Sequence, residues 1–181
     1  MSGIIGVSPN MKSGNVGMFP AGHILQCKSV DFNGIQTVTG YSYVQITNFS
    51  IDMACTHKNN KVVGMGTLNL SGSERYGAMR VAVDGTTTAF MGTGSGLRKE
   101  VTVSSMYNSQ ETNANLMNFV SSFTFEYAPG DTNSHTYTCN ISNTNGSGNS
   151  NNVYINRGHL DENGAHTHRG YSSWVMMEVE V

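Results

Sequence analysis

Apolar and polar positions alternate most regularly between residues 119 and 141. From 119 to 127 one side of an extended chain is mainly aromatic, and the other carries hydroxyl groups and a carboxylate. After the breaker 128–133 (APGDTN), the alternation resumes from 134 to 141. This pattern predicts two adjacent antiparallel strands whose aromatic faces need a second sheet to cover them. The residues we expect to pack between sheets or between subunits are Phe123, Phe125, Tyr127, Tyr137, Trp174 and Met176.

Shorter alternating runs predict the other strands. Residues 61–70 and 75–83 are expected to form a hairpin, and Asp84 with Gly85 is the strongest turn signal in the chain. Gly64 and Gly66 leave one strand face bare, which suits the close approach of a backbone or an aromatic ring. The remaining strands are expected at 23–29, 36–47, 48–56, 86–91, 101–103, 153–157 and 172–181.

The fold class follows from this series of strands. About nine or ten short strands at regular spacing, without helical period, are typical of a sandwich, jelly roll or small barrel. No repeat of fixed period is visible, which disfavours a propeller or a solenoid. We therefore predict an all-β fold, a single jelly-roll domain over residues 22–181.

Residues 1–21 have neither helical nor strand period, so this segment is expected to be an extended arm without a core of its own. It is richer in apolar residues than a free tail, which favours docking on a partner; disorder is the alternative. The predicted anchoring residues are Ile4, Ile5, Val7, Met11, Val16, Met18 and Phe19.

Composition narrows the classes of partner. Charged residues make up 12% of the chain and the formal net charge is −2, which gives no electrostatic footprint for nucleic acid or an anionic membrane. The N-terminus lacks the basic and apolar regions of a secretory signal.

The three cysteines are expected to be small buried residues in a reducing compartment, with a Cys27–Cys55 disulfide as the alternative. They are Cys27, Cys55 and Cys139.

Candidate chemistry is sparse. Three histidines near two carboxylates are conceivable metal ligands, but the ligand set of structural zinc is missing and a polar surface loop is the preferred interpretation. Residues 92–96 (GTGSG) lack the lysine and helix of a phosphate loop, and no nucleophile elbow occurs. We expect no cofactor and no enzyme activity. The weak metal candidates are His159, His166 and His168. An exposed carbohydrate platform is the functional interpretation of Tyr41, Tyr43, Tyr107 and Tyr171, and packing in the core or between subunits is the alternative.

Several segments resemble a family of short virion proteins from tailed phages, chiefly aquatic ones. The opening 1–14 (MSGIIGVSPNMKSG) with 19–26 (FPAGHILQ) is the most specific, and the others are 91–98 (MGTGSGLR), 153–157 (VYINR) and 172–178 (SSWVMME). Members are labelled tail-fibre or capsid-associated proteins. Their C-terminal domains resemble the trimeric jelly rolls of tumour necrosis factor and complement heads.

The resemblance implies a homotrimeric capsid cement or decoration protein, synthesised in the host cytoplasm and placed on the capsid exterior, where the arm binds the major capsid protein. Low charge and hydroxyl-rich strand faces agree with packing around a three-fold axis. A trimeric tail-fibre tip that binds a host glycan or surface protein through loops 92–118 and 143–152 is the second hypothesis. A cupin-type enzyme is the third hypothesis. Its barrel needs His and carboxylate ligands clustered on facing strands, and in this sequence only one loop region offers such residues.

Overall fold

The structure of the chain is a computed structural model that describes residues 21–72, 76–87, 91–92, 100–106, 119–143, 152–158 and 169–181. Within these ranges all regular structure is β, which confirms the predicted all-β class. The arm 1–21 lies outside the described residues except for Ala21. The strands are β1 (Ile24–Phe32), β2 (Gln36–Thr39), β3 (Val44–Ala54), β4 (Lys61–Gly72), β5 (Tyr76–Val83), β6 (Thr86–Thr87), β7 (Val103–Met106), β8 (Phe119–Tyr127), β9 (Ser134–Asn143), β10 (Asn152–Ile155) and β11 (Ser172–Val179).

The first sheet is built around β4. Gly64 pairs with Met176 of β11 and with Phe125 of β8, so these two strands lie on opposite sides of β4. β1 pairs with β11 at the edge, and β10 followed by β2 continues the sheet beyond the start of β11. The main body of this sheet therefore has the order β1-β11-β4-β8, with all pairs antiparallel.

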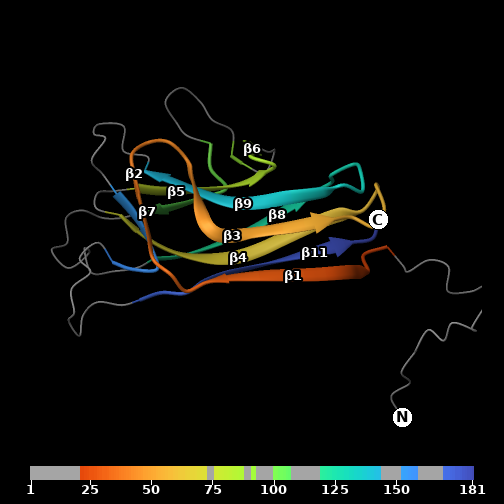
Figure 1. Cartoon of the computed structure of the whole chain (residues 1–181), viewed down its shortest axis with the longest axis horizontal. Helices are drawn as coiled ribbons and strands as arrows, with labels where there is room; N and C mark the ends of the chain where they lie inside the picture. Colours follow the sequence, from red (N-terminus) through yellow and green to blue (C-terminus); the bar gives the residue numbers. More distant parts are fainter. Residues whose placement is uncertain are drawn as a thin grey trace, which may run out of the picture.

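The second sheet has the order β3-β9-β5, with β6 and β7 along the remaining side of β5. The long strands alternate between the sheets in chain order, because β1, β4, β8 and β11 belong to the first sheet and β3, β5 and β9 to the second. This repeated crossing is the jelly-roll arrangement that the sequence predicted. Figure 1 shows the long strands running side by side, with β1 next to β11.

Aromatic rings fill the space between the sheets. Trp174 is the centre of this cluster, with ring centroids 6.1 Å from Phe49, 6.0 Å from Phe123 and 6.1 Å from Phe125. Gly64 and Gly66 make room for these rings, because a Cβ at Gly64 would lie 2.1 Å from Phe125 and one at Gly66 2.8 Å from Phe123. The predicted close approach of aromatic rings to the bare face of this strand is thus confirmed.

Two predicted pairings are wrong. β8 and β9 are not neighbours in one sheet: β8 pairs with β4, whereas β9 pairs with β3 and β5 in the other sheet. The segments 61–70 and 75–83 are likewise not a hairpin, since β4 and β5 belong to different sheets. In both cases the connection passes from one sheet to the other, which a short polar linker permits as readily as a hairpin turn.

Two strand boundaries also differ from the prediction. The expected strand 36–47 is interrupted at residues 40–43, where Gly40 has a φ of 93°. β3 then extends to Ala54 as one strand, with a register shift between Gln45 and Ser50 where Asn48 has a φ of 55°. A residue with positive φ turns the backbone out of the strand direction, and the four-residue interruption lets β2 and β3 join different sheets.

The predicted Asp84–Gly85 turn is confirmed. Both residues have positive φ, and the turn connects β5 to β6.

Asn156 follows the last residue of β10 and connects three segments of the first sheet by hydrogen bonds. Its φ is 59°, and its side-chain amide donates hydrogen bonds to the carbonyl oxygens of Phe32 (2.7 Å) and Gly34 (2.9 Å). The Ser172 hydroxyl donates to the Asn156 Oδ1 atom at 2.7 Å, and the backbone N–H of Asn156 donates to Asn69. One side chain therefore connects the segment after β1, the end of β10 and the start of β11.

The last strand is anchored by a buried carboxylate. Glu178 is 0% exposed and accepts hydrogen bonds from Gln26 (2.6 Å), Asn60 (2.6 Å) and both the N–H and the hydroxyl of Thr56. Burial acts to raise the pKa of Glu178, but the hydrogen bonds outweigh it and hold the pKa below its ordinary value. The ionised side chain thus ties β11 to β1 and to the β3–β4 connection.

Candidate functional site: the outer face of the first sheet

Strand alternation divides the side chains of the first sheet into two sets. The inward set forms the core, and the outward set forms a surface that we call the outer face. Its members pair across β1, β11, β4 and β8 in three rows. The rows are Asp31, Ser173, Thr67 and Ser122; Ser29, Val175, Met65 and Thr124; and Cys27, Met177, Val63 and Glu126.

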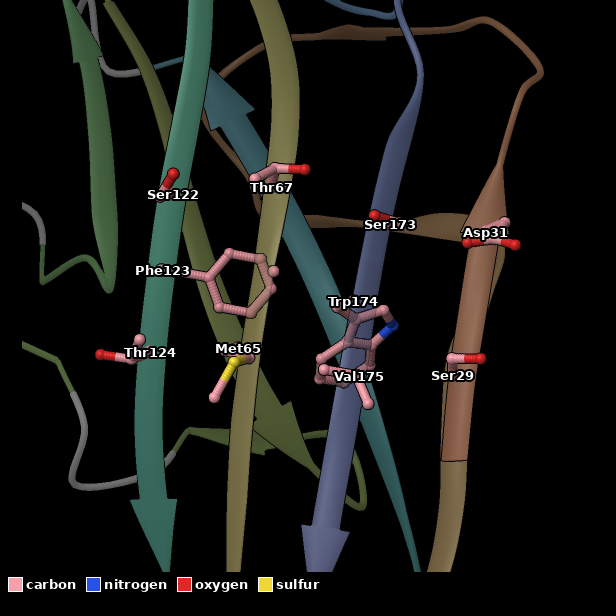
Figure 2. A pocket seen from close by; sticks show the side chains of 11 residues that line it. Ser29, Asp31, Met65, Thr67, Ser122, Phe123, Thr124, Ser173, Trp174 and Val175 are labelled. Atoms are coloured by element: carbon pink, nitrogen blue, oxygen red, sulfur yellow. The ribbon is translucent and has the colours of Figure 1, made fainter. Parts of the chain in front are cut away.

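A shallow groove of about 380 Å³ crosses the first two rows of this face. Figure 2 shows hydroxyl groups at Thr67, Ser122 and Ser173 around it, with Met65 and Val175 between the outer strands. Gly66 lies in the lining, so the inward rings of Phe123 and Trp174 reach the base of the groove. The surface is therefore a mixture of apolar and hydroxyl groups over an aromatic layer.

Charge is scarce on the outer face. Of its twelve members, only Asp31 and Glu126 carry carboxylates, and Glu126 is paired with Lys61 at 2.5 Å. Met65 is 40% exposed, and Val120, which extends the outward set of β8 beyond the rows, is 65% exposed. Surfaces depleted of charge and containing methionine resemble the core of a protein interface, because little desolvation energy opposes their burial.

The packing residues predicted from the sequence all face the core: five belong to the inward set of the first sheet, and Tyr137 faces them from β9 of the second sheet. Five of them are buried between the sheets, and Tyr127 is partly buried against the same core. These six side chains therefore hold the two sheets of one chain together. The residues available to a partner are their neighbours one position along, such as Val175 and Met177 beside Trp174 and Met176. The alternation of the last strand contained this signal, since its odd-numbered residues 175, 177, 179 and 181 are all apolar.

Several predicted site residues lie outside the described residues. These are the weak metal candidates His159, His166 and His168, together with Tyr107 and all of the arm anchors: Ile4, Ile5, Val7, Met11, Val16, Met18 and Phe19. In the described part of the chain, no group of three His, Cys, Asp or Glu side chains is arranged to hold a metal ion. No helix in that part is long and apolar enough to cross a membrane.

The tyrosines proposed as a carbohydrate platform are distributed over different places. Tyr41 and Tyr43 lie in the connection between β2 and β3, and Arg80 of β5 sits 4.1 Å above the Tyr43 ring. Tyr171 lies beside the first sheet, immediately before β11, and hydrogen bonding to Asp31 raises its pKa. Tyr43 is thus engaged by its own domain, and Tyr171 belongs to the end of the outer face.

The cysteines are all free, so the Cys27–Cys55 disulfide is absent. Cys55 and Cys139 are buried as predicted, and burial raises the pKa of both thiols. The prediction for Cys27 is wrong, because its side chain is exposed. Position 27 has the outward parity of β1, opposite to the parity of Val30, which packs on the core.

Comparison with solved structures gives distant similarities to several chains, one of them a viral capsid protein. The chain is similar to VP2 of infectious bursal disease virus in the crystal structure of a subviral particle, with 14% sequence identity and a TM-score of 0.37. The match covers 99% of this chain and 46% of that chain, so this protein spans less than half of the VP2 chain. No protein-family model and no curated protein matches the sequence.

Proposed function

We propose that this protein is a structural component of a phage virion, a homotrimeric capsid cement protein whose copies pack through the outer face. The observation that carries the proposal is the scarcity of charge across four strands of that face, where Val63, Met65, Val175 and Met177 lie among hydroxyl groups. Burying such a face in an interface costs little desolvation free energy, because few charged groups lose their hydration.

A cyclic arrangement suits the position of this face. The face lies over β11 and β4, the two inner strands of the main body of the first sheet, so three copies can direct it toward a common axis. Interfaces that hold proteins together stably bury about 1,200–2,000 Å² in total. The three paired rows, with Val120 and Val179 next to them, supply a contiguous surface for such contacts.

The arm would anchor the trimer to the major capsid protein. It joins the domain beside the end of β11, because the N–H of Gly22 donates to the Glu180 carbonyl at 2.7 Å and the N–H of Glu180 donates to His23 at 2.9 Å. Arms that start at one end of the sandwich can reach neighbouring capsid subunits by strand addition or by filling a groove. The trimer then adds buried surface that resists the internal pressure of the packaged genome.

Binding to emptied phage capsids tests this function. Labelled full-length protein is expected to bind, and deletion of residues 2–19 is expected to abolish binding while the trimer and its circular dichroism spectrum are retained. A matched variant with Ile4 and Ile5 changed to Asp should weaken binding in the same way. Binding to host cells instead of capsids would overturn the cement proposal and favour a tail-fibre tip. An unchanged affinity after the deletion would overturn the anchoring role of the arm.

A further inference from the structure

His135 lies at the end of the sandwich between two carboxylates from separate connections. Its Nδ1 atom is 2.6 Å from Oδ2 of Asp84, in the β5–β6 turn, and its Nε2 atom is 3.0 Å from Oδ1 of Asp131, in the β8–β9 connection. The His135 side chain is 15% exposed, whereas those of Asp84 and Asp131 are 49% and 42% exposed. We call this arrangement the His135 bridge.

Both aspartates are fixed by backbone groups as well. Asp84 Oδ1 accepts the N–H of Thr136 at 2.8 Å, and Asp131 Oδ1 accepts the N–H of Asn133 at 2.8 Å. The backbone of Asp84 in turn donates to the Thr136 carbonyl at 2.9 Å. The carboxylates are thus held in place, and the imidazole must satisfy both of them at the same time.

A neutral imidazole cannot do so. It has one N–H and one bare nitrogen, so it donates to a single carboxylate and turns a lone pair toward the other. The imidazolium has two N–H groups and donates to both. Only the protonated ring therefore matches the geometry at both nitrogens while the two aspartates are ionised.

We propose that the His135 bridge is a pH-sensitive connection that joins the β5–β6 turn to the β8–β9 loop when His135 is protonated and releases the loop when it is neutral. The shorter contact, to Asp84, is retained in the neutral form, because one N–H remains and Asp84 lies closer. The released contact is the one to Asp131. This inference concerns the fold itself and does not depend on the proposed capsid role.

Other ionisable side chains lie near the bridge. Cys55 and Tyr137 lie at the same end of the core, and burial raises the pKa of both, so they are neutral at acidic and neutral pH. Tyr127 packs on Tyr137 with ring centroids 6.1 Å apart. Two acids lie further out: Glu178, which faces Cys55, and Asp52, which accepts the Thr136 hydroxyl at 2.6 Å.

The direction of the pH dependence follows from the contacts. The hydrogen bond to Asp84 raises the pKa of His135, burial opposes the rise, and Asp131 adds to it. A raised histidine pKa means that the stabilisation is complete below the unfolded value of about 6.5 and is lost as the pH rises through the folded value. The pKa of Asp84 and Asp131 is lowered by hydrogen bonds from His135 and backbone amides, so both stay ionised in mild acid.

Carbon-detected NMR titration of the histidine rings in the full-length protein tests the proposal. The probes are the His135 ring and the amide of Asn133 in the wild type, in Asp131→Asn and in Asp84→Asn, with Asp52→Asn as the matched control that does not touch the ring. We expect His135 to titrate above the ordinary histidine value of about 6.5 and the Asn133 amide to shift with the same midpoint. Asp131→Asn should lower that midpoint, and Asp52→Asn should leave it unchanged.

Stability gives a second, independent measurement. The folding equilibrium constant of the wild type relative to His135→Gln should fall as the pH rises from 5.5 to 8, by about tenfold for each unit that separates the folded and unfolded pKa. A neutral ring protonated on Nδ1 above the midpoint supports retention of the Asp84 contact. The proposal is overturned if His135 titrates no higher than an unperturbed histidine, at about 6.5, or if Asp131→Asn leaves its midpoint unchanged.

Discussion

Phe125 of β8 stacks against Tyr137 of β9 across the core, with ring centroids 6.3 Å apart and an interplanar angle of 22°. The two strands are consecutive in the chain but belong to opposite sheets. Their aromatic faces therefore cover each other directly. Gly64 of β4 permits this contact, because it is the cross-strand partner of Phe125 and leaves room for the ring.

Gly64→Ala should destabilise the domain strongly. The added Cβ would lie 2.1 Å from the Phe125 ring, so the ring must leave its position between the sheets. Overpacking of a well-packed core costs about 1–3 kcal/mol in the free energy of unfolding, which urea denaturation measures. Gly72→Ala is the control on the same strand, since its Cβ would be 3.5 Å from the nearest atom. Equal losses at both positions would contradict the assigned role of Gly64.

Glu178→Gln should lower stability at neutral pH. The amide would place N–H donors toward Gln26, Thr56 or Asn60, which already donate to this position. Leaving buried donors without an acceptor costs about 1–3 kcal/mol in the free energy of unfolding. Glu126→Gln is the control, because its ion pair with Lys61 is exposed.

The same carboxylate predicts a dependence on acid. The pKa of Glu178 is lower in the folded chain than in the unfolded chain, so its stabilisation is present above the unfolded value of about 4.3 and is lost as the pH falls through the folded value. Urea midpoints measured between pH 6 and pH 3 should therefore fall more steeply for the wild type than for Glu178→Gln. Parallel curves would show that Glu178 does not contribute to acid unfolding.

Two substitutions at Asn156 separate its backbone conformation from its side-chain contacts. Asn156→Gly keeps the positive φ without strain but removes the amide that donates to Phe32 and Gly34, whereas Asn156→Ala loses the amide and also disfavours a φ of 59°. We expect both to lower the unfolding free energy and Ala to lower it further, by about 1 kcal/mol. Thermal unfolding in matched buffer checks the order, and a less stable Gly variant would contradict it.

Alternation predicted the strands and their faces well, because a side-chain period of two depends only on extended backbone. It did not predict which strands pair. The linker 128–133 connects β8 to β9 across the sandwich, yet its glycine, proline and asparagine also suit a hairpin. Local sequence specifies that the chain turns there; the sheet that receives the next strand is decided by which aromatic faces must cover each other.

The candidate site could be predicted only in part. The apolar last strand and the hydroxyl-rich strand faces favour packing between copies, which stays a prediction. For Trp174 and Met176 the sequence left packing between sheets and packing between subunits open, and the structure places both side chains in the core. The polar clusters around Glu178 and His135 join residues far apart in the chain, so no local pattern announces them. Their members become neighbours only when the strands are paired.

Cys27 offers a direct probe of the outer face in the native protein. Its thiol is exposed in the single chain, whereas Cys55 and Cys139 are buried. If copies pack through the outer face, Cys27 should react slowly with a thiol reagent at high protein concentration and quickly after dilution below the dissociation range. The two buried thiols should stay unreactive in both conditions. Fast labelling at all concentrations would place Cys27 outside any contact between copies.

Sedimentation equilibrium of the wild type and of Met65→Arg tests whether three copies pack through the outer face. Met65 lies in the middle row of the outer face, so a buried unpaired charge there should separate the copies while the core is untouched. Gln45→Arg, at an exposed position of β3 in the second sheet, is the control. We expect three copies of the 19.5 kDa chain for the wild type and the control and one copy for Met65→Arg. A monomeric wild type, or a trimer that survives Met65→Arg, would contradict this expectation.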